Sequence, residues 1–164
     1  MMREGKERYE VYRVKGLDWK TVLGRRKIRY DEILFSVNLY SERYNLSGVV
    51  DAIYRIGNIY RVLEIKNTSL YGDIPLDHLL QGVTYAVMVE DVWGVKIDRI
   101  DFYYIENDVY TSKPFNRYLK ALWMRRYKRL IKVLYGLESP RVSRERAKCI
   151  SCFYFKRFCL GYLE

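Results

Sequence analysis

Residues 48–66, GVVDAIYRIGNIYRVLEIK, consist of two runs rich in apolar, strand-forming residues on either side of a Gly-Asn pair at 57–58. A two-residue turn that begins with glycine between such runs is typical of a β-hairpin. We therefore expect Ile56 to pair with Ile59. Side chains alternate between the two faces of a sheet along each strand, so this register also fixes which residues share a face.

Counting five residues along each strand from that pair sets Asp51 opposite Glu64, and Lys66 projects from the same face as Glu64. Opposed residues have Cβ atoms about 5 Å apart, and like charges placed so are destabilising. Such a carboxylate pair needs a shared proton, a cationic partner or a metal ion. The stretch alone leaves two hypotheses open: a salt-bridged cluster neutralised by Lys66, or a metal site.

The rest of the chain alternates helical and strand-like periodicity. The pattern predicts a short amphipathic helix over residues 3–14, a strand over 28–40, a helix that starts at Pro75 and ends at Gly94, a strand over 95–107 and a basic amphipathic helix over 115–135. With the hairpin, this order predicts an α/β fold with a mixed central sheet flanked by helices.

The chain has 164 residues, which suits one domain over 1–164 with a basic, Cys-rich tail over 141–164. Its apolar runs are shorter than the roughly 18 residues of a membrane span, and its start is too charged for a secretion signal. We therefore expect a cytoplasmic protein that does not bind membranes. The oligomeric state is not readable from the sequence, and an oligomer is compatible with it.

The net charge of +10 is concentrated in the last third of the chain. Residues 1–112 hold 16 Lys and Arg against 17 Asp and Glu, whereas residues 113–164 hold 14 against 3. Aromatic residues are interleaved with these cations, as in surfaces that follow a nucleic-acid backbone and stack its bases. We expect a DNA-binding surface that includes Arg125 and Arg129. A solvated helix face above core aromatic residues is the alternative.

All three cysteines, Cys149, Cys152 and Cys159, lie within eleven residues of the tail. Three thiols cannot pair evenly, and C-x2-C is the spacing of both zinc and iron-sulfur sites. The pattern favours a metal centre over three unrelated cysteines.

Gln81 and Tyr85 stand at i and i+4 of the predicted helix and therefore share one face. His78, the single histidine of the chain, lies three residues before Gln81 and would join that face. A lone histidine on a helix is more often a surface or satisfied core residue than a catalytic or ligand residue.

Taken in order, Gly48-Val-Val-Asp51, Glu64-Ile-Lys66, Gln81-x3-Tyr85 and the terminal cysteines resemble the RecB-like nucleases of the PD-(D/E)XK superfamily, and among them the CRISPR-associated iron-sulfur exonucleases and their viral relatives. The likeness runs from about residue 5 to 159.

This resemblance implies a RecB-like nuclease core in which Asp51 and Glu64 hold Mg²⁺ or Mn²⁺ with the main-chain carbonyl of Ile65. Lys66 would orient the attacking water or offset charge in the transition state. Gln81 would support the site.

The resemblance also implies that Tyr85, with Gln81, contacts the DNA strand, and that the cysteines hold an iron-sulfur cluster. The activity expected is a metal-dependent exonuclease on single-stranded DNA ends, in CRISPR spacer acquisition with integrase partners or in viral DNA processing. The alternative is a non-catalytic nucleic-acid-binding adaptor on a nuclease scaffold.

Two departures from the family pattern bear on these expectations. Tyr9 stands where the family carries a metal-binding histidine, and neighbouring Glu10 is its candidate substitute. No fourth cysteine precedes the first predicted helix. We therefore expect an iron-sulfur cluster that is incomplete, labile or absent.

Overall fold

The computed structural model describes residues 29–140, and the predicted helix over 3–14 and the tail over 141–164 lie outside that range. In chain order the elements are β1 (Glu32–Ser41), β2 (Leu46–Ile56), β3 (Ile59–Lys66), α2 (Leu76–Trp93), β4 (Ile97–Tyr104), β5 (Val109–Pro114) and α3 (Arg117–Leu134). None of the described helices is both long and apolar enough to cross a membrane.

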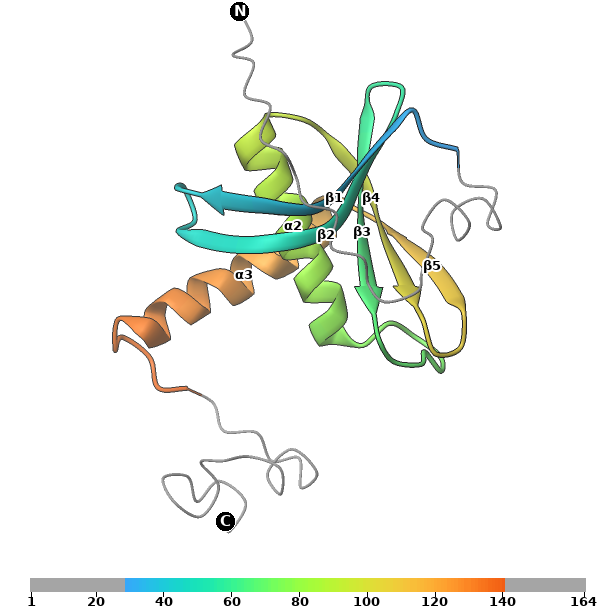
Figure 1. Cartoon of the computed structure of the whole chain (residues 1–164). Helices are drawn as coiled ribbons and strands as arrows, with labels where there is room; N and C mark the ends of the chain where they lie inside the picture. The colour runs from blue at the N-terminus through green and yellow to red at the C-terminus, as the bar shows by residue number, and fades with distance from the viewer. Residues whose placement is uncertain (1–28, 141–164) are drawn as a thin grey trace, which may run out of the picture. The chain divides into compact units, whose positions relative to one another are not determined.

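The strands form one five-stranded sheet in the order β1-β2-β3-β4-β5. β3 and β4 are parallel and are joined through α2, whereas the other neighbours are antiparallel (Figure 1). The predicted α/β class with a mixed sheet is confirmed. The sequence pattern did not indicate β5, which returns along β4 after a turn where Asp108 has a φ of +52°.

β2 and β3 form the predicted hairpin. Ile56 pairs with Ile59, and the ladder continues to the pair Ala52–Leu63. Gly57 in the turn has a φ of +60°, a conformation that glycine adopts at little cost. The predicted register is confirmed, and the backbone pairing ends one pair before Asp51 would meet its partner.

The sheet bends sharply at Asp51. In the β1–β2 ladder, the pairs on either side are formed, but Ser36 and Asp51 do not pair, and Ser36 has a φ of +51° inside its strand. Beyond the bend the faces exchange: Gly48 lies against Tyr85 of α2, whereas Ala52 belongs to a cluster on the opposite face of the sheet. Figure 1 shows both strands changing direction along their length.

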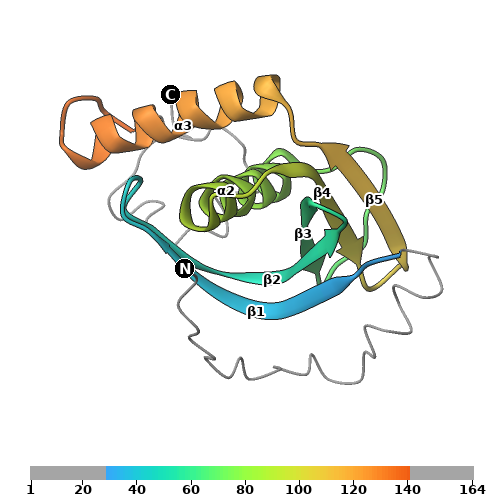
Figure 2. The same cartoon turned by 90° about the horizontal axis from the view of Figure 1, so that it is seen from above.

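α2 lies in the curve of the sheet (Figure 2) and supplies much of the buried core. It begins directly after Pro75 and ends at Gly94, which has a φ of +65°, as the sequence predicts. A Cβ added at Gly82 would lie 2.7 Å from Ile100 and 2.8 Å from Phe102 of β4. Glycine therefore allows the close approach of α2 to the strands behind the site.

The chain divides into two compact units after Trp123, inside α3. In the first unit, the indole Nε1 of Trp123 donates a hydrogen bond to Thr84 Oγ1 at 2.9 Å, which ties the start of α3 to α2. In the second unit, Leu130 and Leu134 are exposed, so the apolar face predicted for this helix is not buried throughout. A single domain over 1–164 stays a prediction.

Candidate active site

Glu64 is a buried acid in the middle of the sheet. Its side chain projects from β3 toward α2 and is only 2% exposed. Oε1 accepts a hydrogen bond from Lys66 Nζ at 2.8 Å, while Oε2 is buried without a hydrogen-bond partner among the described residues. A buried, unpaired carboxylate oxygen is costly, so this atom needs a proton or a cation.

Asp51 stands at the bend, where β2 has left its ladder with β3. Its Oδ2 accepts a hydrogen bond from the backbone N–H of Ile65 at 2.8 Å. The carboxylate thus satisfies a backbone donor of β3 beyond the last residue pair, Ala52–Leu63, of the β2–β3 ladder. This contact fixes Asp51 beside the residue that follows Glu64.

Burial raises the proton affinity of both acids. Burial raises the pKa of Glu64 to about 7, the charge of Asp51 adds to this rise, and Lys66 opposes it. Burial also raises the pKa of Asp51, against the lowering effects of the Ile65 hydrogen bond and of Lys66. The lysine therefore offsets the acidic pair only in part, because it bonds to one oxygen of Glu64, and the other has no partner within the described range.

Lys66, Gln81 and Tyr85 form a hydrogen-bonded row from β3 onto α2. Lys66 Nζ donates to Gln81 Oε1 at 2.6 Å, and Gln81 Nε2 donates to the Tyr85 hydroxyl at 3.4 Å. A Cβ on Gly48 would lie 2.9 Å from the Tyr85 ring, so glycine leaves room for that ring. The five side chains that the sequence selected therefore lie in one group.

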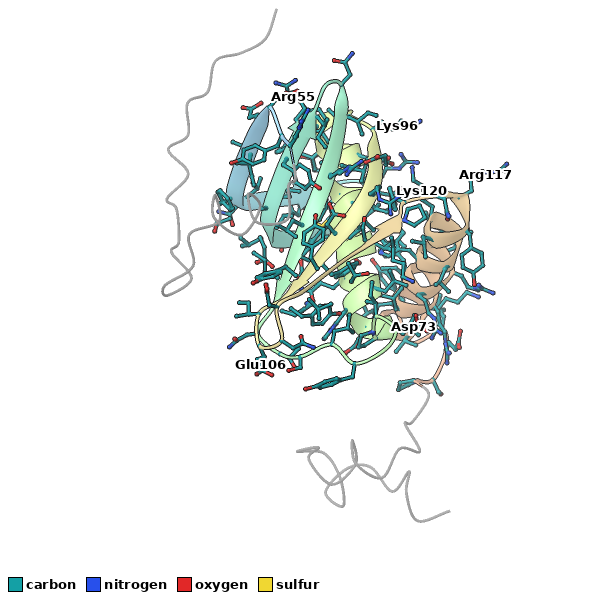
Figure 3. The ribbon with its side chains drawn as sticks, turned by 90° about the vertical axis from the view of Figure 1, so that its right-hand side faces the viewer. Arg55, Asp73, Lys96, Glu106, Arg117 and Lys120 are labelled. Atoms are coloured by element: carbon teal, nitrogen blue, oxygen red, sulfur yellow. The ribbon has the colours of Figure 1, made fainter. Side chains whose placement is uncertain are left out.

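The loop between β3 and α2 is hydrogen-bonded to the turn between β4 and β5. Its Leu70 donates its N–H to Asn107 Oδ1 at 3.1 Å and accepts a hydrogen bond from Asn107 Nδ2 at 2.8 Å. Figure 3 shows Asp73 of this loop and Glu106 of the β4–β5 turn at the same end of the sheet. Lys66, the last residue of β3, leads into this loop.

The donor atoms suit a hard divalent cation. The described residues contain no cluster of three or more His, Cys, Asp or Glu side chains able to hold a metal. Two carboxylates and a main-chain carbonyl would suffice for Mg²⁺ or Mn²⁺ if water completed the coordination, as Mg²⁺ commonly requires. The unpaired Oε2 of Glu64 fits this chemistry, because a cation would replace the missing partner.

A further pair beside the site has only a weak signal in the sequence. His78 Nδ1 lies 3.0 Å from the hydroxyl of Tyr104, which is fully buried. Tyr104 lies next to Lys66 in the parallel ladder of β3 and β4. The spacing of His78 from Gln81 indicated a shared face, but nothing in the β4 segment IDRIDFYY marked its last tyrosine as a site residue.

The other predicted site residues belong to the second unit or fall outside the described range. Arg125 is exposed on α3, and Arg129 Nε lies 2.7 Å from Glu138 Oε1, both within the second unit. The cluster cysteines, like Tyr9 and Glu10, fall outside the described residues. DNA binding by the arginines and metal binding by the cysteines remain predictions.

Comparisons with known proteins identify similar folds only. No protein-family model matches the sequence, and no curated protein matches it. The crystal structure of SSO0001 aligns with a TM-score of 0.51 and 17% identity over 89% of this chain and 66% of its own. A candidate exonuclease from Eubacterium rectale aligns with a TM-score of 0.49 and 12% identity, over 76% of this chain and 56% of its own. The chain thus spans less than two thirds of either structure.

Proposed function

We propose that this protein is a metal-dependent deoxyribonuclease that hydrolyses phosphodiester bonds at single-stranded DNA ends. The observation that carries the proposal is the buried Oε2 of Glu64, which has no hydrogen-bond partner within residues 29–140, on the face that Glu64 shares with Asp51. If the cluster served only as a salt bridge between Lys66 and Glu64, the sheet would not need Asp51 as a second acid. The order of motifs and its resemblance to RecB-like nucleases support the same activity.

Asp51, Glu64 and the main-chain carbonyl of Ile65 would hold Mg²⁺ or Mn²⁺. When bound, such an ion lowers the pKa of a coordinated water and polarises a phosphate oxygen. The rigid strands are suited to hold these ligands in place, because a site on strands is more precise than one on loops.

In this proposal Lys66 would bind the scissile phosphate. An ammonium group has three N–H donors, and two of them are used by Glu64 and Gln81. The third has no acceptor among residues 29–140, and it would serve a phosphate oxygen, where charge develops during the reaction. Because Nζ is hydrogen-bonded to both Gln81 and Glu64, the lysine would keep one orientation while it binds the phosphate.

The proposed substrate also agrees with the charge distribution. The excess of Lys and Arg over residues 113–164, including Arg125 and Arg129, would follow the phosphate backbone of the strand. We also propose that the protein acts either with CRISPR integrase partners or in viral DNA processing. The tail would hold an iron-sulfur cluster. Iron and sulfide analysis of anaerobically purified protein tests the cluster directly.

The deciding experiment follows end-labelled single-stranded DNA with Mn²⁺ and compares wild type with Asp51→Asn and Glu64→Gln. Both near-isosteric variants should lose cleavage and keep the fold. Glu42→Gln, at an exposed acid in the turn between β1 and β2, is the matched control and should cleave normally. Robust cleavage by both acid variants would rule out this active site. Binding without any cleavage by the wild type would favour the adaptor function.

A separate binding measurement tests the basic surface. On single strands, log Kobs should fall with log salt by about 0.7 for each contacted phosphate. Charge reversal at Arg125 and Arg129 should flatten this slope, while reversal of one exposed acid such as Glu42 should not. A catalytically inactive protein whose affinity ignores salt would argue against the surface.

A further inference from the structure

We propose that His78 binds a phosphate group of the substrate strand through Nε2–H, and that Tyr104 is a positioning residue that holds the imidazole in the required tautomer. The identity of the ligand rests on the proposed nuclease function. The assignment itself goes further, because it adds a substrate contact outside the carboxylates, Lys66 and the Gln81–Tyr85 pair.

The geometry places the imidazole beside the site on a buried anchor. Tyr104, the last residue of β4, is 0% exposed, and its hydroxyl lies 3.0 Å from His78 Nδ1. The two ring centroids are 5.7 Å apart. Tyr104 pairs with Lys66 across the parallel ladder, so the anchor stands next to the catalytic lysine.

The hydrogen bond also selects the tautomer. A tyrosine hydroxyl can donate one hydrogen bond, and His78 Nδ1 is the only partner of the Tyr104 hydroxyl among the described residues. If Nδ1–H donated instead, the buried hydroxyl proton would have no acceptor, which is unfavourable. The hydroxyl therefore donates to Nδ1, and the proton of the neutral ring sits on Nε2.

Nε2–H is then a donor without a partner in the described part of the chain. His78 makes no second hydrogen bond with the described residues and lies one helical turn before Gln81, which binds Lys66. Burial first, and then the charge of Lys66, lowers the pKa of His78, so the ring is neutral at physiological pH. An anionic oxygen is the natural acceptor beside an ammonium group.

A metal is a poorer candidate for this nitrogen. Among the described residues no three His, Cys, Asp or Glu side chains come close enough to share an ion, so His78 does not complete a site with Asp51 and Glu64. The other competing role is structural: the bond to Tyr104 would merely fasten α2 to β4. These roles differ in what Nε2 does, since fastening uses Nδ1 alone.

The single histidine makes the first test direct, because the imidazole gives one set of NMR signals without assignment. Long-range ¹H–¹⁵N correlation should show the proton on Nε2 in wild type and a mixture of tautomers in Tyr104→Phe. Tyr103→Phe is the matched control. The Tyr103 side chain lies on the opposite face of β4 from Tyr104, and the substitution removes its 2.8 Å hydrogen bond to Asp108. The His78 tautomer should stay unchanged in this variant.

A thymidine pentanucleotide is then added, in EDTA and again with Ca²⁺, and inorganic phosphate serves as a second probe. The Nε2 signal should shift with the oligonucleotide in at least one buffer, and more than with phosphate. A proton on Nδ1, or an Nε2 signal that ignores the oligonucleotide in both buffers, overturns the contact. This readout does not require cleavage, so a failed nuclease proposal would leave it interpretable.

Activity supplies the second test through two different amides. His78→Asn can place its amide oxygen near the position of Nδ1 and so accept the hydrogen bond from Tyr104, but it has no donor at the Nε2 position. His78→Gln places its nitrogen near Nε2. A phosphate contact predicts a loss in kcat/KM of roughly 10- to 100-fold for the Asn variant, with partial rescue in the Gln variant. Full activity in the Asn variant overturns the proposal.

Discussion

Glu64→Gln should make the metal-free protein more stable at pH 8, although it removes the proposed catalytic centre. The pKa of Glu64 is raised from 4.5 to about 7, mainly by burial. Below about pH 4.5 the carboxyl is protonated in both the folded and the unfolded protein. Above about pH 7 it is ionised in both, and the folded protein carries the cost of the buried charge.

The folded protein therefore loses stability as the pH rises from about 4.5 to about 7. At about 1.4 kcal/mol per pKa unit, the full loss is about 3 kcal/mol. Glutamine avoids this cost but gives Lys66 no charged partner, which removes part of the benefit. We expect a net gain of about 1–2 kcal/mol in the free energy of unfolding at pH 8, and little or none near pH 5.

Urea unfolding in EDTA at pH 5 and pH 8 measures this difference, with Glu42→Gln as the control for loss of an exposed acid. Comparing each variant with wild type at the same pH removes the contribution of other titrating groups. Mg²⁺ or Mn²⁺ should then stabilise wild type at pH 8 by mass action and leave Glu64→Gln unchanged. A Glu64→Gln protein that is less stable than wild type in EDTA at pH 8 would refute the reasoning.

Three further substitutions test the packing around the site. Gly82→Ala should lower the free energy of unfolding by roughly 1–3 kcal/mol in urea, because the new Cβ overlaps two strand residues. Gly48→Ala should displace the Tyr85 ring, so cleavage of single-stranded DNA should fall more than stability does. Asp51→Ala should be about 1 kcal/mol less stable than Asp51→Asn in the same urea assay, since only asparagine keeps an acceptor for the Ile65 N–H. Equal stability of the two would show that this bond contributes nothing.

The hairpin and its polar face could be predicted because turn chemistry and period-2 alternation are local signals. A Gly-led turn fixes the pair Ile56–Ile59, and every later pair follows by counting. The i, i+4 spacing on α2 is equally local, so the row that ends at Tyr85 was also predictable. These features depend only on neighbours along the chain or across one ladder.

The bend, the fifth strand and the buried anchor could not be predicted in this way. Ser36 adopts a left-handed conformation that a serine seldom takes, and no glycine or asparagine marks the position. β5 is short, and its residues 109–114 show no clear alternation of buried and exposed positions. The contact between Tyr104 and His78 depends on how α2 packs on β4, which no spacing along the chain encodes.

The bend explains how two acids can occupy strands that are otherwise apolar. In a continuous ladder, Asp51 would face Glu64 at the distance of an ordinary cross-strand pair, and the repulsion between the two charges would destabilise the fold. Because Asp51 pairs neither with Ser36 of β1 nor with Glu64 of β3 in the backbone ladders, its side chain can turn one oxygen to the Ile65 N–H. That bond ties it to β3 without neutralising it, whereas Glu64 receives only a lysine on one oxygen. The backbone therefore keeps the two carboxylates near each other despite their repulsion. A bound cation would relieve this repulsion at the point where the substrate phosphate is proposed to bind.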